Sequence, residues 1–171
     1  MLPGGKKPLA ATAVGSVRRG APFAKDIDVL VRLPAAARGG VAPPGLAGAT
    51  LRPARRGDRL EVAAVTQNGP RRVALVLRSR GRFYRCDLFG ATAAEEPFAL
   101  FHFTGPAIYN IRIRAFAKRR GWRLNQYGLF SASGHRVRGS AALRSEQELA
   151  EFLGITPRGP GERGAHNPRR S

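Results

Sequence analysis

The stretch GSVRRGAPFAKDIDVLVRLP, Gly15 to Pro34, indicates both the fold and the chemistry of this chain. Asp26 and Asp28 lie two residues apart within a run of apolar and β-branched residues, which is typical of a β-strand. Because side chains alternate between the faces of a strand, both carboxylates are expected on one face, about 6–7 Å apart, with Ile27 on the other. Two carboxylates on a rigid strand are suited to hard cations such as Mg²⁺.

The residues around this strand favour a phosphate site. The Gly15-Ser16 step predicts a tight turn whose backbone N–H groups, with the charges of Arg18 and Arg19, can hold a triphosphate. Asp87, one of only four aspartates, would add a third carboxylate from a neighbouring strand. Each feature alone is more often an ordinary surface feature. Together, in this order, they are what two-metal phosphoryl transfer requires.

The composition indicates a polyanionic partner. The 171 residues suffice for one domain or two small subdomains, and carry 30 Lys and Arg against 11 Asp and Glu, a net charge of +19. A surface this basic most simply binds nucleic acid. Arginine outnumbers lysine 26 to 4, as a GC-rich coding sequence would produce, but that bias does not explain the excess of basic over acidic residues.

The single cysteine, Cys86, allows no intrachain disulfide and is expected to be a small buried residue in a strand. No apolar run approaches the length of a membrane span, and the N-terminus is too weakly apolar for a signal peptide. We therefore expect a soluble, intracellular protein with no membrane partner.

The apolar pattern predicts an α+β fold. Strands are expected at about 9–16, 26–33, 58–66, 71–79 and 82–88. A hairpin at Ser79, Arg80 and Gly81 would join the last two strands. Residues 34–57, rich in Ala, Gly and Pro, are expected to be a loop, and residues 157–171 a disordered basic tail.

Three helices are expected in the second half, at about 95–103, 106–120 and 145–153, with a small sheet over 122–139. In the second helix an apolar stripe is expected to face the core. It consists of Ile108, Ile111, Ala115 and Phe116. In the third, Ser145 and Glu148 have the spacing of a capping box.

The motif FHFTGPAIYNIRIRA, Phe101 to Ala115, together with the Gly-Ser-Asp-x-Asp segment and NQYGLF, resembles the X-family DNA polymerases. The similarity, over about residues 10–156, is greatest to the compact asfarvirus type, which has a palm and a C-terminal subdomain. It implies a nucleotidyltransferase palm at 1–94, with a mixed β-sheet and helices. A small α/β, thumb-like subdomain at 95–156 would contact nucleotide and template. The viral type implies a place in the host cytoplasm or the virion.

The resemblance also implies a role for individual residues. Asp26 and Asp28 would bind two Mg²⁺ ions, with Mn²⁺ as a substitute; Asp87 would bind only the catalytic ion, and Arg85 would orient Asp87. The implied nucleotide-binding residues are Gly15, Ser16, Arg19, His102, Phe103, Gly105 and Asn110. The implied DNA-binding residues are Arg114, Arg112 and Lys118. Asn110 would reach the new base pair and Arg114 the template, four residues apart on one helix face.

These roles predict a template-directed DNA polymerase that fills short gaps in base excision repair, acting on gapped or primed DNA and deoxynucleoside triphosphates. Two alternatives remain open. One is another palm-type nucleotidyltransferase, against which the FTG motif argues. The other is a non-catalytic or weakly active DNA-binding remnant, against which the three aspartates argue.

Only 14 residues precede Gly15, whereas the resembling polymerases have upstream helices that cover the palm sheet. The apolar sheet face must nevertheless be buried against something. It would consist of Ile27, Val29, Val31, Val73, Leu75 and Leu77. The sequence therefore predicts an exposed apolar patch there, giving marginal stability or a contact with a protein partner.

Overall fold

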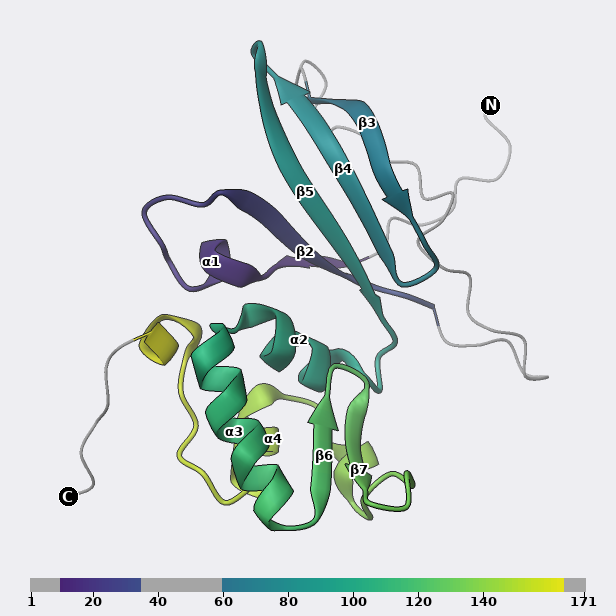
Figure 1. The fold of residues 1–171 in the computed structure, drawn as a ribbon, viewed down its shortest axis with the longest axis vertical. Coiled ribbons are helices and arrows are strands. Elements are labelled where there is room, and N and C mark those ends of the chain that lie inside the picture. Colours follow the sequence, from purple (N-terminus) through teal and green to yellow (C-terminus); the bar gives the residue numbers. More distant parts are fainter. Residues whose placement is uncertain (1–9, 35–59, 165–171) are drawn as a thin grey trace.

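A computed structural model of the chain describes residues 10–34 and 60–164 (Figure 1). The expected loop at 34–57 falls outside these residues from residue 35 onwards, as does the tail beyond residue 164. A five-stranded sheet occupies one end of the molecule, and most of the helices occupy the other. No helix in the described ranges is both long and apolar enough to cross a membrane.

The five-stranded sheet has the order β1-β2-β5-β4-β3. Its strands are β1 (Ala11–Ala13), β2 (Asp26–Arg32), β3 (Leu60–Asn68), β4 (Arg72–Ser79) and β5 (Arg82–Ala91). The β2 and β5 strands are parallel and the other pairs antiparallel, which confirms the expected α+β class with a mixed sheet. Between β4 and β5, Arg80 and Gly81 both have positive φ, 48° and 77°, as in the tight turns that suit the twist of a hairpin.

One face of this sheet is apolar, and its central part is buried. The buried cluster on it comprises Val31, Leu33, Val73, Leu75, Leu77, Cys86 and Leu88, with Ile27 and Val29 partly buried against it. The residues predicted to form an exposed apolar patch are therefore buried or half-buried, so the prediction is wrong at these positions. The exposed apolar side chains of this face lie at its edge, on β3, where Val62 and Val65 are opposite Leu77 and Leu75 and Leu60 is opposite Ser79. Burial, followed by the charges of Asp87 and Asp28, raises the pKa of Cys86 to about 11, so this thiol is inert.

The C-terminal part packs helices around a second core. It contains α2 (Glu96–Thr104), α3 (Ala107–Arg119), β6 (Trp122–Asn125), β7 (Gly128–Ser131), a 3₁₀ turn at Ser140–Ala142 and α4 (Glu146–Phe152). Phe98, Leu129 and Leu149 are fully buried in this core. The predicted cap of α4 is confirmed, since the Ser145 hydroxyl accepts a hydrogen bond from the Glu148 N–H.

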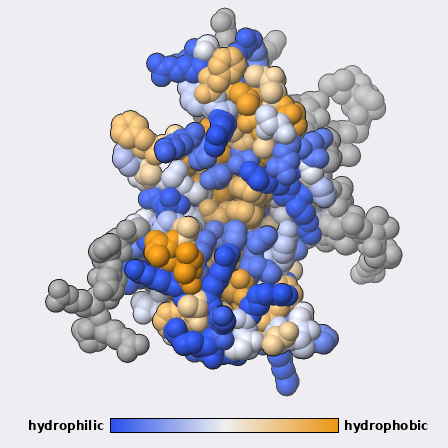
Figure 2. All heavy atoms as spheres, in the orientation of Figure 1, coloured by the Kyte–Doolittle hydropathy of each residue, from blue (hydrophilic) through white to orange (hydrophobic). Residues whose placement is uncertain are grey.

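The predicted orientation of α3 is wrong. Ile108 and Ile111 are 55% and 60% exposed, and the buried side chains on this helix include Tyr109, Ile113 and Ala117. Both stripes have helical spacing, so periodicity alone does not choose between them. The Tyr109 ring, which belongs to the buried stripe, contacts Phe101 of the preceding helix, at 5.6 Å between ring centroids, and the distant Arg163 guanidinium at 5.3 Å. Apolar surface is accordingly visible over the start of α3 in Figure 2.

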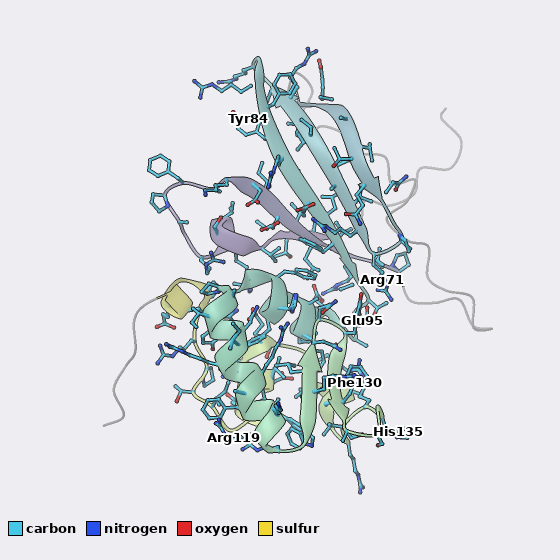
Figure 3. The ribbon with its side chains drawn as sticks, viewed as in Figure 1. Arg71, Tyr84, Glu95, Arg119, Phe130 and His135 are labelled. Carbon is cyan, nitrogen blue, oxygen red and sulfur yellow. The ribbon has the colours of Figure 1, made fainter. Side chains whose placement is uncertain are left out.

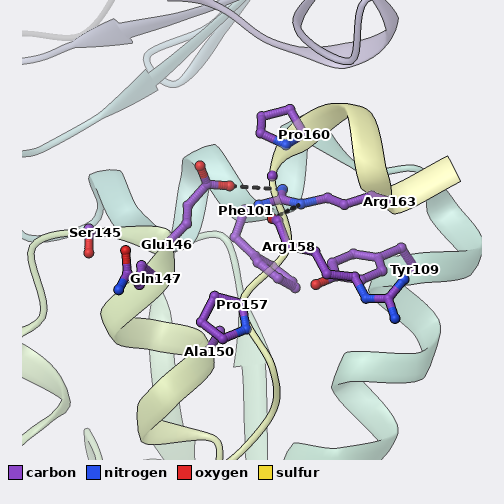
Figure 4. Close-up of a pocket in the computed structure, with 11 residues that line it drawn as sticks. Phe101, Tyr109, Ser145, Glu146, Gln147, Ala150, Pro157, Arg158, Pro160 and Arg163 are labelled. Carbon is purple, nitrogen blue, oxygen red and sulfur yellow. Dashed lines mark hydrogen bonds and ion pairs between the residues drawn. The ribbon is translucent and has the colours of Figure 1, made fainter. Parts of the chain in front are cut away.

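Residues 157–164, expected to be part of a disordered tail, are also folded. Pro160–Gly164 form the 3₁₀ helix η2. Arg163 is only 6% exposed; it pairs with Glu146 at 2.8 Å, and its guanidinium lies 5.3 Å from the ring centroids of Phe101 and Tyr109 (Figure 4). These contacts hold the segment against α2, α3 and α4. The contacting residues line a hollow of about 310 Å³.

Candidate active site

The register of β2 and β5 brings the three aspartates together on one sheet face. Asp28 lies directly opposite Asp87, and Asp26 opposite Arg85. Residues opposite one another in a parallel pair share a face, so the carboxylates lie on the side away from the apolar cluster that contains Cys86. The structure thus gives the shared face and the neighbouring strand that the sequence predicted.

The carboxylates repel one another. The pKa of Asp28 is raised, first by burial and then by the negative charges of Asp26 and Asp87, while Arg19 and Arg72 act in the opposite direction. A divalent cation beside these oxygens would relieve the repulsion, and a set of carboxylate donors suits Mg²⁺ or Mn²⁺. The donor atoms present are therefore of the type that binds the implied ions.

Arginines hold the outer two carboxylates. Arg72 on β4 donates to both carboxylate oxygens of Asp87, at 3.1 Å, whereas Arg85 lies 3.6 Å from Asp26. The prediction that Arg85 orients Asp87 is therefore not what the structure shows, and the sequence analysis missed Arg72. Only the register of β4 against β5 could have indicated it. Within the described residues, no three acidic, His or Cys side chains are grouped closely enough to chelate an ion as they stand.

The predicted Gly-Ser turn is the start of a one-turn helix, α1 (Gly15–Arg18), packed directly against Asp28. The Val14 N–H donates to the Asp28 carbonyl at 2.8 Å. Gly15 has φ of +61°, and a Cβ atom on it would lie 2.2 Å from the Asp28 carboxylate oxygen Oδ2. Glycine is thus required here both by the backbone and by the close approach of the carboxylate.

A cleft of about 360 Å³ lies between α1 and β2 on one side and α2 and α3 on the other. The sheet side contributes Gly15, Ser16, Arg19, Asp26 and Asp28, and the helical side His102, Phe103, Gly105, Pro106, Ala107 and Asn110. All seven residues to which the resemblance gave a nucleotide-binding role line this one cleft, with two of the three aspartates.

Contacts across the cleft join its two walls. Both Arg18 and Arg19 donate to Thr104, which is fully buried, the first to its hydroxyl and the second to its carbonyl. Phe103 stacks on Phe89 of β5, with ring centroids 3.9 Å apart. The Gly105–Pro106 peptide bond that follows is cis.

His102, Asn110 and Arg114 form a connected group. Burial, and secondly the charge of Arg114, lowers the pKa of His102 to about 4, so its imidazole is neutral and Nδ1 accepts from the Arg114 guanidinium at 2.6 Å. The Asn110 amide donates to the His102 carbonyl at 2.7 Å, while its buried Oδ1 has no hydrogen-bond partner within the described part of the chain. This oxygen is able to accept a hydrogen bond from a donor group of a bound ligand.

The other predicted DNA contacts lie outside the cleft. Arg112 and Lys118 are exposed on α3, so both can reach a phosphate backbone. Arg114 differs from them, since it is half-buried and bonded to His102.

Comparison with known proteins bears on this site. Residues 99–164 match the family model described as DNA polymerase beta thumb. "Repair DNA polymerase X" of African swine fever virus (isolate Tick/Malawi/Lil 20-1/1983) is 36% identical over 151 residues, which cover 88% of this chain and 79% of the viral protein. "DNA polymerase lambda" of Rattus norvegicus is 32% identical over 171 residues, covering 91% of this chain and 29% of the rat protein. "DNA polymerase/3'-5' exonuclease PolX" of Bacillus subtilis is 26% identical, covering 82% of this chain and 22% of that protein. The chain belongs to the X family of DNA polymerases.

Proposed function

We propose that this chain is a template-directed DNA polymerase that adds deoxynucleotides to a primer 3′-hydroxyl and fills short gaps during DNA repair. The observation that carries this proposal is the single cleft in which Asp26 and Asp28, the Gly15-Ser16 turn and Asn110 meet. The names of its viral and mammalian relatives, a repair polymerase and a DNA polymerase, support the same reading.

In this proposal the sheet part, to residue 94, is the palm, and the helical part from residue 95 is the thumb-like subdomain. The η2 helix, Pro160–Gly164, belongs with the helical part, because Arg163 is buried against it. The cleft between the two parts would hold the incoming nucleotide.

In this proposal, different residues of the cleft would bind the phosphates and the metal ions. The N–H groups of the Gly15-Ser16 turn and the charge of Arg19 would bind the β- and γ-phosphates. Asp26, Asp28 and Asp87 would hold two Mg²⁺ ions. Bound there, the ions supply charge that lowers the pKa of the primer hydroxyl and stabilises the leaving pyrophosphate.

The helical wall would position the sugar and the base. His102 and Phe103 would lie against the sugar of the nucleotide, and Asn110 would approach the minor-groove edge of the new base pair. Arg114 would contact the template base beside that pair. Its guanidinium group is oriented by the hydrogen bond to the neutral His102 ring. Arg112 and Lys118, exposed on the same helix, would bind phosphates without reading sequence.

The experiment is primer extension on DNA with a one-nucleotide gap, with and without Mg²⁺ or Mn²⁺. Asp28→Asn keeps the side-chain size but removes one charge from the cluster, so we expect extension to fall about a hundredfold or more with DNA affinity nearly unchanged. Since the Asp28 charge is repelled by two neighbours, the same variant should also unfold at a higher temperature when no metal is present.

Glu151→Gln is the matched control, since Glu151 is an exposed carboxylate on α4 away from the cleft. It should extend primers at the wild-type rate. Wild-type extension by Asp28→Asn would remove the catalytic assignment. Nucleotide addition that ignores the template would favour the other nucleotidyltransferase, and DNA binding with no addition in either metal would favour the remnant.

A further inference from the structure

The sheet face that carries the aspartates continues beyond them to the tip of the β4–β5 hairpin. Along β5, Arg85 and Phe83 follow Asp87 on this face at two-residue intervals, and β4 contributes the side chains paired with them. We call this surface the hairpin face; it consists of Ala74, Val76, Arg78, Phe83 and Arg85. It has an apolar floor with arginines on both strands.

Phe83 is unusual on this face because it is 65% exposed, although it is a large apolar side chain. The Arg85 side chain is 78% exposed, and Arg78, also exposed, pairs with Glu61 of β3 at 2.6 Å. Neither the three aspartates nor the nucleotide cleft uses Phe83. An aromatic ring between arginines is suited to a strand of nucleic acid, with phosphates on the guanidinium groups and a sugar or base on the ring.

The position of the hairpin face relative to the cleft indicates which strand of the DNA it would contact. The triphosphate turn at Gly15 lies on the α2 side of Asp28, whereas the hairpin projects from the opposite end of the sheet (Figure 1). In phosphoryl transfer the attacking and leaving oxygens lie roughly in line, on opposite sides of the phosphorus. A primer end that attacks a nucleotide held in the cleft therefore approaches along β5 from the hairpin.

We propose that the hairpin face binds the primer strand and that Phe83 packs against one of its deoxyribose rings. This inference rests on the proposed polymerase function. Phe83 lies four positions before Asp87 on the strand, a distance of about 13 Å. One strand of a duplex rises about 3.4 Å per nucleotide, so the contact lies about three or four nucleotides from the primer end. Figure 2 shows hydrophilic atoms beside apolar surface on this hairpin.

If Phe83 packs against a deoxyribose ring, a 2′-hydroxyl added to that one nucleotide of the primer should weaken DNA binding and extension. Gapped DNA would be prepared with a single ribonucleotide at each of positions two to six from the primer 3′ end, and affinity and insertion rate measured. A 2′-hydroxyl pressed against the Phe83 ring loses its water without gaining a partner, so the wild type should bind and extend about fivefold less well at one or two adjacent positions. Phe83→Ala should lose this penalty there and keep the wild-type KM for the nucleotide.

Tyr84→Ala is the matched control. Tyr84, labelled in Figure 3, is the next residue on the same strand and is 40% exposed. Because side chains alternate along a strand, it lies on the opposite sheet face. It should keep the wild-type pattern of penalties. The same position-specific penalty in Phe83→Ala as in the wild type would overturn the inference, as would an absent penalty in the wild type.

Two further outcomes are separable. If Phe83→Ala leaves the ribonucleotide pattern intact but changes the mass seen by light scattering, the hairpin face is a protein contact and the inference is wrong. If the wild type extends no primer, the polymerase function fails, and the affinity scan still decides whether Phe83 contacts the strand.

Discussion

At the scale of single residues, Gly15 at the start of α1 lies in close contact with Asp28 of the carboxylate cluster. The backbone of α1 begins against the carboxylate itself, so the position of Asp28 depends on a residue with no side chain. His102, which lines the same cleft, is kept neutral by burial and by the charge of Arg114, which together lower its pKa to about 4. Both features combine geometry and charge, and each gives a prediction.

Gly15→Ala should reduce activity far more than Gly20→Ala does. Both glycines have left-handed φ, +61° and +74°, so alanine should cost about 1–2 kcal/mol of stability at either position. Only at Gly15 does the new Cβ meet the Asp28 carboxylate; nothing lies within 4 Å at Gly20. Urea unfolding and primer extension on both variants check this. Equal loss of activity in the two would show that strain alone, and not displacement of Asp28, matters.

Arg114→Ala should raise the pKa of His102 from about 4 without restoring its ordinary value, because burial is the larger cause of the shift. A histidine whose pKa is lowered on folding disfavours the native state once the pH falls below the unfolded pKa of about 6.5. The wild type should therefore lose stability as the pH falls from that value towards 4, and Arg114→Ala should lose less. NMR titration of the His102 ring and unfolding at several pH values measure both effects. An unchanged pKa in the variant would contradict the assigned contact.

At the scale of elements, ion pairs fasten the sheet part to the helical part. Arg32 and Arg71 of the sheet part pair with Glu96 and Glu95 at the start of α2; Figure 3 labels Arg71 and Glu95 at this junction. On the other side, Glu146 at the start of α4 pairs with Arg18 of α1 at 2.6 Å and with Arg163 of η2 (Figure 4). One carboxylate of α4 thus joins η2, which follows it, to α1, which is far away in the sequence.

Glu146→Gln should destabilise the fold by about 2 kcal/mol, because it leaves two largely buried guanidinium groups without a counter-charge. The Arg163 side chain is only 3% exposed, so it cannot regain water without releasing η2. Chemical denaturation measures the loss, and amide exchange should show residues 160–164 opening first. Glu151→Gln, on the exposed side of the same helix, controls for the change of charge. Equal stability of the two variants would mean that the Glu146 pairs contribute nothing.

At the scale of the whole molecule, a net charge of +19 surrounds a sheet face with three carboxylates. The positive field favours binding of a polyanion, and in the proposed function the acidic cluster is where a cation would bind. On that proposal, overall charge attracts the DNA, and the geometry of the cleft determines where the reaction would take place.

DNA affinity should depend steeply on salt. A protein that neutralises six to ten phosphates loses about 10³- to 10⁵-fold in affinity between 50 and 200 mM salt. We expect a loss in this range for duplex DNA of any sequence, and a slope reduced by about one unit when Lys118 is replaced by Ala. Fluorescence anisotropy at several salt concentrations gives the slope. A shallow dependence would show that few of the basic residues contact phosphate.

The sequence by itself determined the features that local backbone geometry fixes. The two-residue spacing of Asp26 and Asp28 placed both on one strand face, the Arg80-Gly81 turn set the hairpin, and Ser145 capped α4. The family motif further identified the residues that line the cleft, although they come from distant segments. These predictions needed no knowledge of which distant segments touch.

Only the tertiary structure decided the features that depend on long-range partners. Which stripe of α3 is buried depends on the contact of Tyr109 with Arg163, and the fold of residues 157–164 depends on the burial of Arg163 beside Glu146. In the same way, the register of β4 against β5 places Arg72, and not Arg85, where it donates a hydrogen bond to Asp87. The physical reason is that the spacing of apolar residues is compatible with more than one buried helix face and more than one pairing of side chains between strands. Packing between distant segments selects one of them.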